Sequence, residues 1–212
     1  MITNKLNNVL VLAPHTDDGE LGAGGTISLL LEKKAKVYYA AFSTASDSVP
    51  AGMPKDILKT EVAKATKQLG ISKENLIIFD YQVRKLNFSR QDILEDLIRL
   101  RKDIHFDLVL MPSLNDIHQD HLTVSQEGLR AFKTCSILGY ELIWNNLTFN
   151  TTCFVRIEKR HLDNKIKALQ SYESQKGRDY ISADFIKSLA RTRGVQIGAK
   201  YAEAFEVIRW VI

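Results

Sequence analysis

The chain has 212 residues, 45% of them hydrophobic and 25% charged, and its 29 basic and 25 acidic residues leave a formal net charge of +4. This length allows one sizeable core, so we expect a single domain over residues 1–212, and the mild, scattered basic excess argues against nucleic-acid binding. The two cysteines, Cys135 and Cys153, form no CxxC pair, and there is neither an apolar leader nor a run of about 18 apolar residues, so we expect buried thiols and a cytoplasmic protein without a membrane span.

Apolar strands alternate with helices through the first part of the chain. The expected strands span 8–14, 36–43, 75–79 and 107–112, and the expected helices span 24–34, 56–70, 89–103 and a segment that starts near His121. Gly22, Gly24 and Gly25 are expected to form a tight turn that enters the first helix, and Gly70 is expected to end the second. This alternation favours an α/β fold, with a mostly parallel sheet covered by helices on both faces.

The pattern changes after residue 136. Segments 138–144 and 153–157 read as strands without a full helix between them, helices follow near 159–171 and 183–193, and residues 202–212 read as a closing strand. We therefore expect the C-terminal part to add strands and helices to the same domain. The loop 44–55, rich in Pro, Gly and Ser, is either the rim of a pocket or a plain surface loop.

Polar side chains gather directly after two of the expected strands. They are His15, Asp17 and Asp18 after the first strand, and His118, Asp120 and His121 after the fourth. Ligands of open α/β sheets bind outside the carboxyl ends of the strands, so the two clusters meet if these strands are neighbours. The alternatives are an Asp-Asp-Gly turn for the first cluster and a polar helix start capped by Asp120 for the second.

The combined donor set is typical of a catalytic zinc site. Two imidazoles and one carboxylate leave a fourth position open for water, whose pKa zinc lowers toward about 7. A free carboxylate and a spare imidazole remain, and these suit proton transfer and the stabilisation of an oxyanion.

The glycines that follow do not form a dinucleotide-binding fingerprint. They stand at positions 19, 22, 24 and 25, so the G-x-G-x-x-G spacing is absent. The adjacent aspartates would also place negative charge where a pyrophosphate should lie, whereas they suit a cation. The sequence therefore favours a metal site over a phosphate cradle.

At these residues the sequence resembles the PIG-L/LmbE-like family of metal-dependent de-N-acetylases. The family's first motif is typically Ala-His-Pro-Asp-Asp-Glu followed by Gly-Gly, and here it reads Pro14-His15-Thr16-Asp17-Asp18-Gly19-Glu20, then Gly24-Gly25. The proline is displaced by one position and Gly19 stands where glutamate is usual, with Glu20 as a candidate replacement. The later His-x-Asp-His motif is intact at residues 118–121.

This resemblance implies a Rossmann-like parallel sheet and the hydrolysis of an N-acetyl amide. It implies that zinc, or another divalent metal, is held by His15, Asp18 and His121. Asp17 would be the general base, His118 would polarise the amide oxygen, and Asp120 would hydrogen-bond an imidazole and set its tautomer. Family members deacetylate N-acetylglucosaminyl groups, so the implied partner is a small amino-sugar conjugate.

Three further residues are candidates for substrate binding, each with an alternative. Glu61 lies at the edge of the apolar face of the helix at 56–70, or it is a surface glutamate. Trp144 stacks on a sugar face, or it packs in the core or at the edge of the sheet. Arg193 binds substrate, or it complements a helix C-terminus.

Three other functions stay open from the sequence. The chain is a metal-dependent hydrolase of another amide or acyl group, a metal-binding protein without turnover, or a dinucleotide-binding oxidoreductase. The sequence also leaves open whether the protein forms a homo-oligomer.

Overall fold

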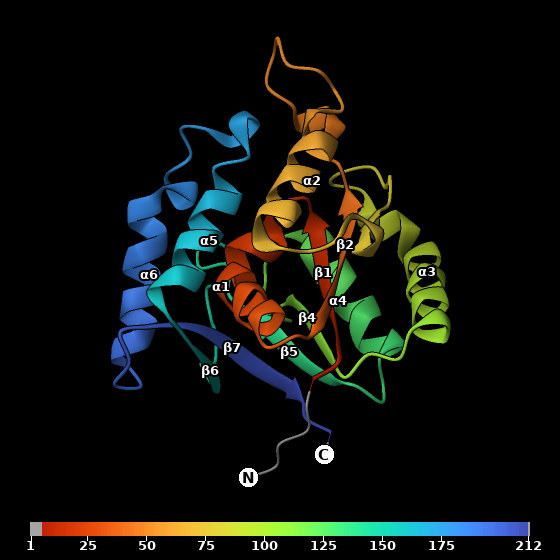
Figure 1. Cartoon of the computed structure of the whole chain (residues 1–212). Coiled ribbons are helices and arrows are strands. Elements are labelled where there is room, and N and C mark those ends of the chain that lie inside the picture. The colour runs from red at the N-terminus through yellow and green to blue at the C-terminus, as the bar shows by residue number, and fades with distance from the viewer. Residues whose placement is uncertain (1–5, 212) are drawn as a thin grey trace.

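Seven strands form one sheet in the computed structural model, which describes residues 6–211 (Figure 1). The strands are β1 (Asn8–His15), β2 (Lys36–Ser43), β3 (Leu76–Ile78), β4 (Leu108–Pro112), β5 (Ser136–Tyr140), β6 (Cys153–Ile157) and β7 (Tyr201–Arg209). Their order is β3-β2-β1-β4-β5-β7-β6, and β7 runs antiparallel to both of its neighbours while the other pairs are parallel. The predicted α/β class with a mostly parallel sheet is confirmed.

Helices cover both faces of this sheet. They are α1 (Asp18–Glu32), α2 (Ile57–Leu69), α3 (Arg90–Asp103), α4 (Gln119–Ala131), α5 (Lys159–Leu169) and α6 (Ala183–Val195). Figure 1 shows α1, α2, α5 and α6 on one side and α3 and α4 on the other.

Each face of the sheet has its own apolar core. Along β1, Val9, Val11 and Ala13 join the core beneath α1, while Leu10 and Leu12 join the core beneath α3 and α4. Successive side chains of a strand point to opposite faces, so a strand between two helical layers must be apolar throughout. This explains the continuous apolar run of the first strand.

The first helix begins six residues earlier than the sequence predicted, at Asp18 instead of residue 24. The tight turn expected from Gly22, Gly24 and Gly25 is therefore wrong, because these glycines lie inside α1. Their role is close packing: a Cβ on Gly22 would lie 2.2 Å from the Tyr140 ring. Acidic residues in the first turn suit the positive end of a helix, which favours the earlier start.

Several smaller expectations also changed. β5 ends at Tyr140, four residues before the predicted end of that strand. Cys135 is buried as expected, but Cys153 is only partly buried. Residues 1–5 and Ile212, on which part of the leader and closing-strand predictions rest, lie outside the described residues. Among the helices of residues 6–211, none combines the length and apolar composition needed to cross a bilayer.

Candidate active site

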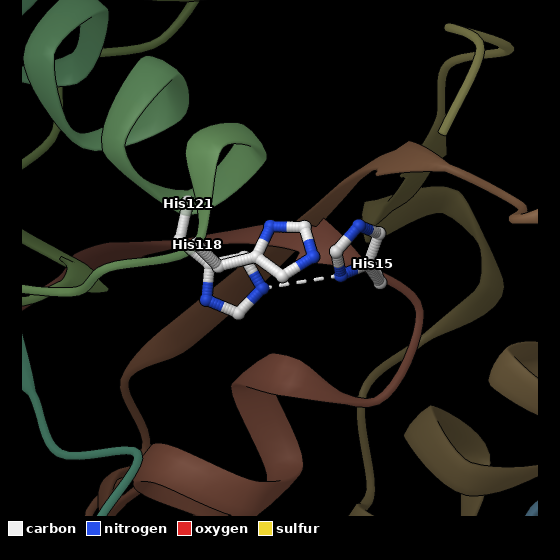
Figure 2. A group of neighbouring side chains, drawn as sticks. All are labelled: His15, His118 and His121. Carbon is white, nitrogen blue, oxygen red and sulfur yellow. Dashed lines mark hydrogen bonds between the residues drawn. The ribbon is translucent and has the colours of Figure 1, made fainter. Parts of the chain in front are cut away.

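The two predicted polar clusters meet where the strand order of the sheet reverses. From β1 the chain builds outward through β2 and β3, and then returns to place β4 on the other side of β1. Such a switch point leaves a crevice at the carboxyl ends of the two central strands. His15 is the last residue of β1, whereas His118 and His121 stand at the start of α4, just after β4 (Figure 2).

Three donor atoms form a nearly regular triangle in this crevice. His15 Nδ1 lies 3.1 Å from His121 Nε2, and Asp18 Oδ2 lies 3.2 Å from each of them. Two ligands of a tetrahedral zinc ion are about 3.3 Å apart, given zinc–ligand bonds of about 2.0–2.1 Å. The three residues therefore fit one small divalent cation without rearrangement.

Two further carboxylates orient the imidazoles of this triangle. His15 Nε2 lies 3.0 Å from Asp120 Oδ2, and His121 Nδ1 lies 2.8 Å from Asp116 Oδ2. A carboxylate accepts a hydrogen bond only from a ring nitrogen that carries hydrogen, so when each ring is neutral its lone pair is on the opposite nitrogen, which faces the triangle. Both carboxylates are almost fully buried.

Asp116 was not singled out from the sequence. It lies in the same "NDIHQDH" segment, and its other oxygen accepts a hydrogen bond of 2.8 Å from the backbone N–H of His118. An aspartate two residues before the first histidine is the signal that was available. The contact between Asp116 and His121 depends on the fold of α4, which brings the His121 ring next to Asp116.

The third imidazole, that of His118, is held differently. Its Nδ1 accepts a hydrogen bond of 3.2 Å from the backbone N–H of Asp120 and so caps the start of α4. Burial is the main cause that lowers the pKa of His118, with the neighbouring imidazoles adding to it. The ring is therefore neutral, and its single hydrogen is on Nε2.

A set of three imidazoles is also available geometrically. His15, His118 and His121 offer nitrogen atoms that all lie within 4.8 Å of one another. The rings of His15 and His118 meet edge to face at a centroid distance of 4.9 Å, and those of His118 and His121 stack at 4.5 Å. The residues around the crevice can thus hold a metal ion, with two candidate ligand sets.

The metal-free crevice binds protons strongly. Burial acts to lower the pKa of His15, but the charge of Asp18 and the bond to Asp120 outweigh it and raise this pKa to about 9. In the same way Asp18 and Asp116 raise the pKa of His121 to about 10. Burial opposes ionisation of Asp18, yet the two imidazoles hold its pKa well below its usual range. A cation that takes this place must displace these protons.

Asp17 stands beside the triangle without belonging to it. It occupies the N-cap position of α1, but its side chain makes no capping hydrogen bond. Burial and the adjacent Asp18 charge raise its pKa to about 6. It lines the same cavity as the three imidazoles, so a carboxylate with a pKa of about 6 lies in the crevice beside them.

That cavity has a volume of about 310 Å³. Beyond the polar clusters it is lined by Ala45 and Ser48 from the loop 44–55, which is therefore a pocket rim, and by Arg84, Trp144, Arg178 and Tyr180. The rings of Trp144 and Tyr180 stack at a centroid distance of 4.3 Å with an interplanar angle of 20°. Of the three predicted substrate-binding residues, Trp144 thus reaches the pocket.

The other two candidates lie outside the lining of this pocket. Glu61 is buried, and its carboxylate accepts a hydrogen bond of 3.0 Å from the backbone N–H of Ser174 and another from the Ser174 hydroxyl. The Arg193 guanidinium is paired with Glu141. Both side chains therefore have structural partners within the fold.

Gly19 and Glu20 are explained by a tyrosine behind the crevice. A Cβ on Gly19 would lie 2.6 Å from the ring of Tyr39, so a side chain there would have to displace that ring. Glu20 is fully buried and lies within hydrogen-bond distance of the Tyr39 and Tyr172 hydroxyls, which also approach the Thr16 carbonyl. Through these two hydroxyls Glu20 is linked to the backbone between His15 and Asp17. The hydrogen-bond partners of the Glu20 side chain in residues 6–211 include no imidazole.

Comparison with known proteins finds similar chains. Residues 10–132 match the family model described as PIG-L, GlcNAc-PI de-N-acetylase. The chain is 26% identical over 177 residues to the uncharacterized deacetylase YaiS of Escherichia coli, covering 81% of this chain and 93% of that protein. It is 25% identical over 229 residues to a diacetylchitobiose deacetylase of Thermococcus kodakarensis, covering 97% and 84% of the two chains.

A solved structure shows the same fold. The N,N'-diacetylchitobiose deacetylase of Pyrococcus horikoshii, complexed with an inhibitor, matches with a TM-score of 0.81 and 22% identity. The match covers 96% of this chain and 84% of that chain. The overall arrangement of the sheet and its helices is therefore shared with that structure.

Proposed function

The chain belongs to the PIG-L family of de-N-acetylases, and from this membership we propose that it is a zinc-dependent hydrolase that removes the N-acetyl group from an N-acetylglucosamine-type amino-sugar derivative. The observation that carries the proposal is the triangle of His15 Nδ1, Asp18 Oδ2 and His121 Nε2, with sides of 3.1–3.2 Å. Two of the relatives are named for a diacetylated amino sugar, which supports this substrate class.

Hydrogen placement favours His15, Asp18 and His121 as the ligands over a set of three imidazoles. His118 cannot offer a lone pair from Nε2, because its Nδ1 already accepts the Asp120 N–H and the ring must carry its hydrogen on the other nitrogen. When bound by the three proposed ligands, zinc would acidify a water molecule and polarise a carbonyl oxygen. Asp116 and Asp120 hold the two ligand imidazoles in orientation.

Asp17 is proposed as the general base and then the general acid. It lines the cavity, does not cap its helix and has a pKa raised to about 6. A carboxylate of this pKa takes a proton from the attacking water and afterwards delivers it to the amine nitrogen that leaves.

His118 is proposed to stabilise the amide oxygen. His118 lines the same cavity, and its Nε2–H would donate a hydrogen bond to that oxygen as negative charge develops on it. The Trp144 and Tyr180 rings provide an apolar surface for a sugar face. Glu61 and Arg193 are not part of this proposal, since both are bound elsewhere.

An acetate-release assay tests this function. Zinc-loaded protein is incubated with a panel of N-acetylglucosamine conjugates, with Asp17→Asn as the catalytic variant and Asp103→Asn, an exposed carboxylate at the end of α3, as the control. We expect Asp17→Asn to keep one zinc per chain and to lose at least about 100-fold in kcat, while Asp103→Asn matches the wild type.

Two results would overturn parts of this proposal. If the zinc-loaded protein releases acetate from no conjugate, the deacetylase function is wrong, and a hydrolase of another amide or a metal-binding protein without turnover replaces it. If Asp17→Asn turns over at the wild-type rate, the assignment of the base is wrong while the function stands.

A further inference from the structure

Two arginines at the pocket have no carboxylate partner among the described residues. Arg84 donates a hydrogen bond of 3.1 Å to the Ser48 hydroxyl, and Arg178 donates to the Tyr180 hydroxyl. Five of the eleven arginines in residues 6–211 pair with a carboxylate, and of the remaining six these two line the pocket. Both pocket arginines are exposed, so their guanidinium groups keep free N–H donors at the mouth of the cavity.

The backbone of Arg84 adopts a conformation that does not suit arginine. Its φ is +64°, in the left-handed region that glycine and asparagine occupy more readily. The conformation is held by a hydrogen bond of 2.6 Å from its N–H to Asp120 Oδ2, the same oxygen that lies 3.0 Å from His15 Nε2. The Arg84 backbone is therefore bonded to the carboxylate that orients a proposed metal ligand.

A glycine would satisfy this backbone with less strain. The Arg84 side chain is exposed and its one described contact is a serine hydroxyl, so packing does not account for an arginine here. Backbone strain clusters at functional sites, and of the three non-glycine residues with positive φ in residues 6–211, Arg84 and Ala45 both line the pocket.

Arg178 lies beside the aromatic surface of the pocket. Its guanidinium carbon is 5.8 Å from the centroid of the Tyr180 ring, and that ring stacks on Trp144. A group bound by Arg178 would therefore adjoin whatever lies against the aromatic pair.

Negative and positive side chains occupy different parts of the pocket. Asp18 is buried in the crevice and Asp17 lies beside it, whereas the two arginines stand exposed at the mouth. Planar guanidinium groups bind carboxylates and phosphates through paired N–H donors. An anionic group would thus be repelled by the unmetallated aspartates and attracted to the mouth.

Resting on the proposed function, we propose that the amino-sugar substrate carries an anionic substituent, a carboxylate or a phosphate, which Arg84 and Arg178 bind at the mouth of the pocket. The substituent lies beyond the N-acetyl group, which the proposed function places over the metal site. The two arginines thus determine specificity.

The first arm of the test measures kcat/KM of zinc-loaded protein for acetate release. Neutral N-acetylglucosamine is compared with its 1-phosphate, its 6-phosphate and N-acetylmuramic acid, which separate phosphate from carboxylate. We expect at least one charged compound to be preferred by about tenfold or more, and the preference to fall as ionic strength rises from about 0.05 M to 0.5 M.

Variants assign this preference to the arginines. We expect Arg84→Gly and Arg178→Gln each to reduce the charged-to-neutral ratio by about tenfold, while Arg156→Gln, an exposed arginine on β6, leaves the ratio at the wild-type value. Arg84→Gly should keep or raise the melting temperature, because glycine accepts a φ of +64°. A fall in melting temperature with an unchanged ratio would show that Arg84 is structural and would overturn its part of the proposal.

The second arm does not depend on turnover. Binding of glucosamine 6-phosphate, glucosamine 1-phosphate, muramic acid and glucosamine to the metal-free protein is measured by calorimetry, with the same variants. Binding of an anion that the arginine variants abolish, without acetate release, would overturn the deacetylase function and keep the anion site. Acetate release with no preference for any charged compound would keep the function and overturn the anion site.

Discussion

At the scale of single residues, the site is organised by where hydrogens stand on three imidazoles. Asp120 and Asp116 each accept a hydrogen bond from one ring nitrogen, so in the neutral rings the other nitrogen of His15 and His121 can bind a metal. His118 instead accepts a helix N–H and keeps a donor for substrate. The hydrogen-bond partners thus divide the three histidines into two proposed metal ligands and one proposed donor to the substrate.

Substituting Asp116 tests this division of roles. We expect Asp116→Asn to weaken zinc binding by about 10- to 100-fold, because an amide orients the His121 ring less strongly than a carboxylate and raises its basicity less. Competition with a chromophoric chelator measures this affinity, and Asp103→Asn serves as the exposed control. Unchanged zinc affinity in Asp116→Asn would show that this hydrogen bond does not support the metal.

The ligand set is tested by two matched histidine variants. We expect His121→Gln to lose zinc binding by at least about 100-fold and His118→Gln to bind one zinc with an affinity within about tenfold of the wild type. Equilibrium dialysis followed by metal analysis measures both. If His118→Gln loses the metal as completely as His121→Gln, the three-imidazole set is correct and the proposed set is wrong.

At the scale of elements, a buried ion pair forms hydrogen bonds to the backbone of helix α1. Glu203 on β7 accepts hydrogen bonds from the backbone N–H groups of Gly25 at 3.0 Å and Thr26 at 2.6 Å. Lys165 on α5 donates to the Leu21 carbonyl at 2.7 Å and lies 2.6 Å from Glu203. Because α1 begins with Asp18, the C-terminal part of the chain thereby holds the helix that supplies a proposed ligand.

Breaking this pair should destabilise the fold. We expect Lys165→Met to lower the free energy of unfolding by about 3–5 kcal/mol, since it leaves the Glu203 charge buried without its partner. Urea unfolding measures the loss, and Lys167→Met, an exposed lysine on the same helix, is the control. We expect Lys165→Met with Glu203→Gln to recover part of the loss; a single variant as stable as the control would contradict a structural role for the pair.

At the scale of the whole molecule, the strand order brings together residues far apart in sequence. His15 and His121 are 106 residues apart, yet their ring nitrogens lie 3.1 Å from each other because β1 and β4 are neighbours. The two antiparallel strands β6 and β7 then extend the sheet and carry Glu203 to α1. The site therefore draws on both the parallel and the antiparallel part of the sheet.

Much of this organisation could be predicted from local patterns. The apolar runs predicted β1, β2 and β4 to within about a residue at each end, because buried strands read as continuous apolar segments. The start of α1 was missed, since glycine usually weakens a helix, and only the position of Tyr140 explains why Gly22 is needed inside one.

The walls of the pocket could not be predicted in this way. Arg84, Arg178 and Tyr180 lie in segments without a motif, and their importance depends on which loops fold over the carboxyl ends of β1 and β4. Glu61 and Arg193 were candidates from their residue type and position on a helix, but partners from distant segments hold them. The two polar motifs could be recognised in the sequence, whereas the residues that become neighbours only in the folded chain could not.

Zinc titration of the metal-free protein, followed by the initial rate of acetate release, tests the metal-dependent deacetylase most directly. A single metal held by His15, Asp18 and His121 predicts no release in excess chelator, and a rate that rises linearly and levels off at about one zinc per chain. The rate is measured on the best substrate of the N-acetylglucosamine panel. Full activity in excess chelator, or no acetate at any ratio of zinc to protein, would contradict a metal-dependent deacetylase.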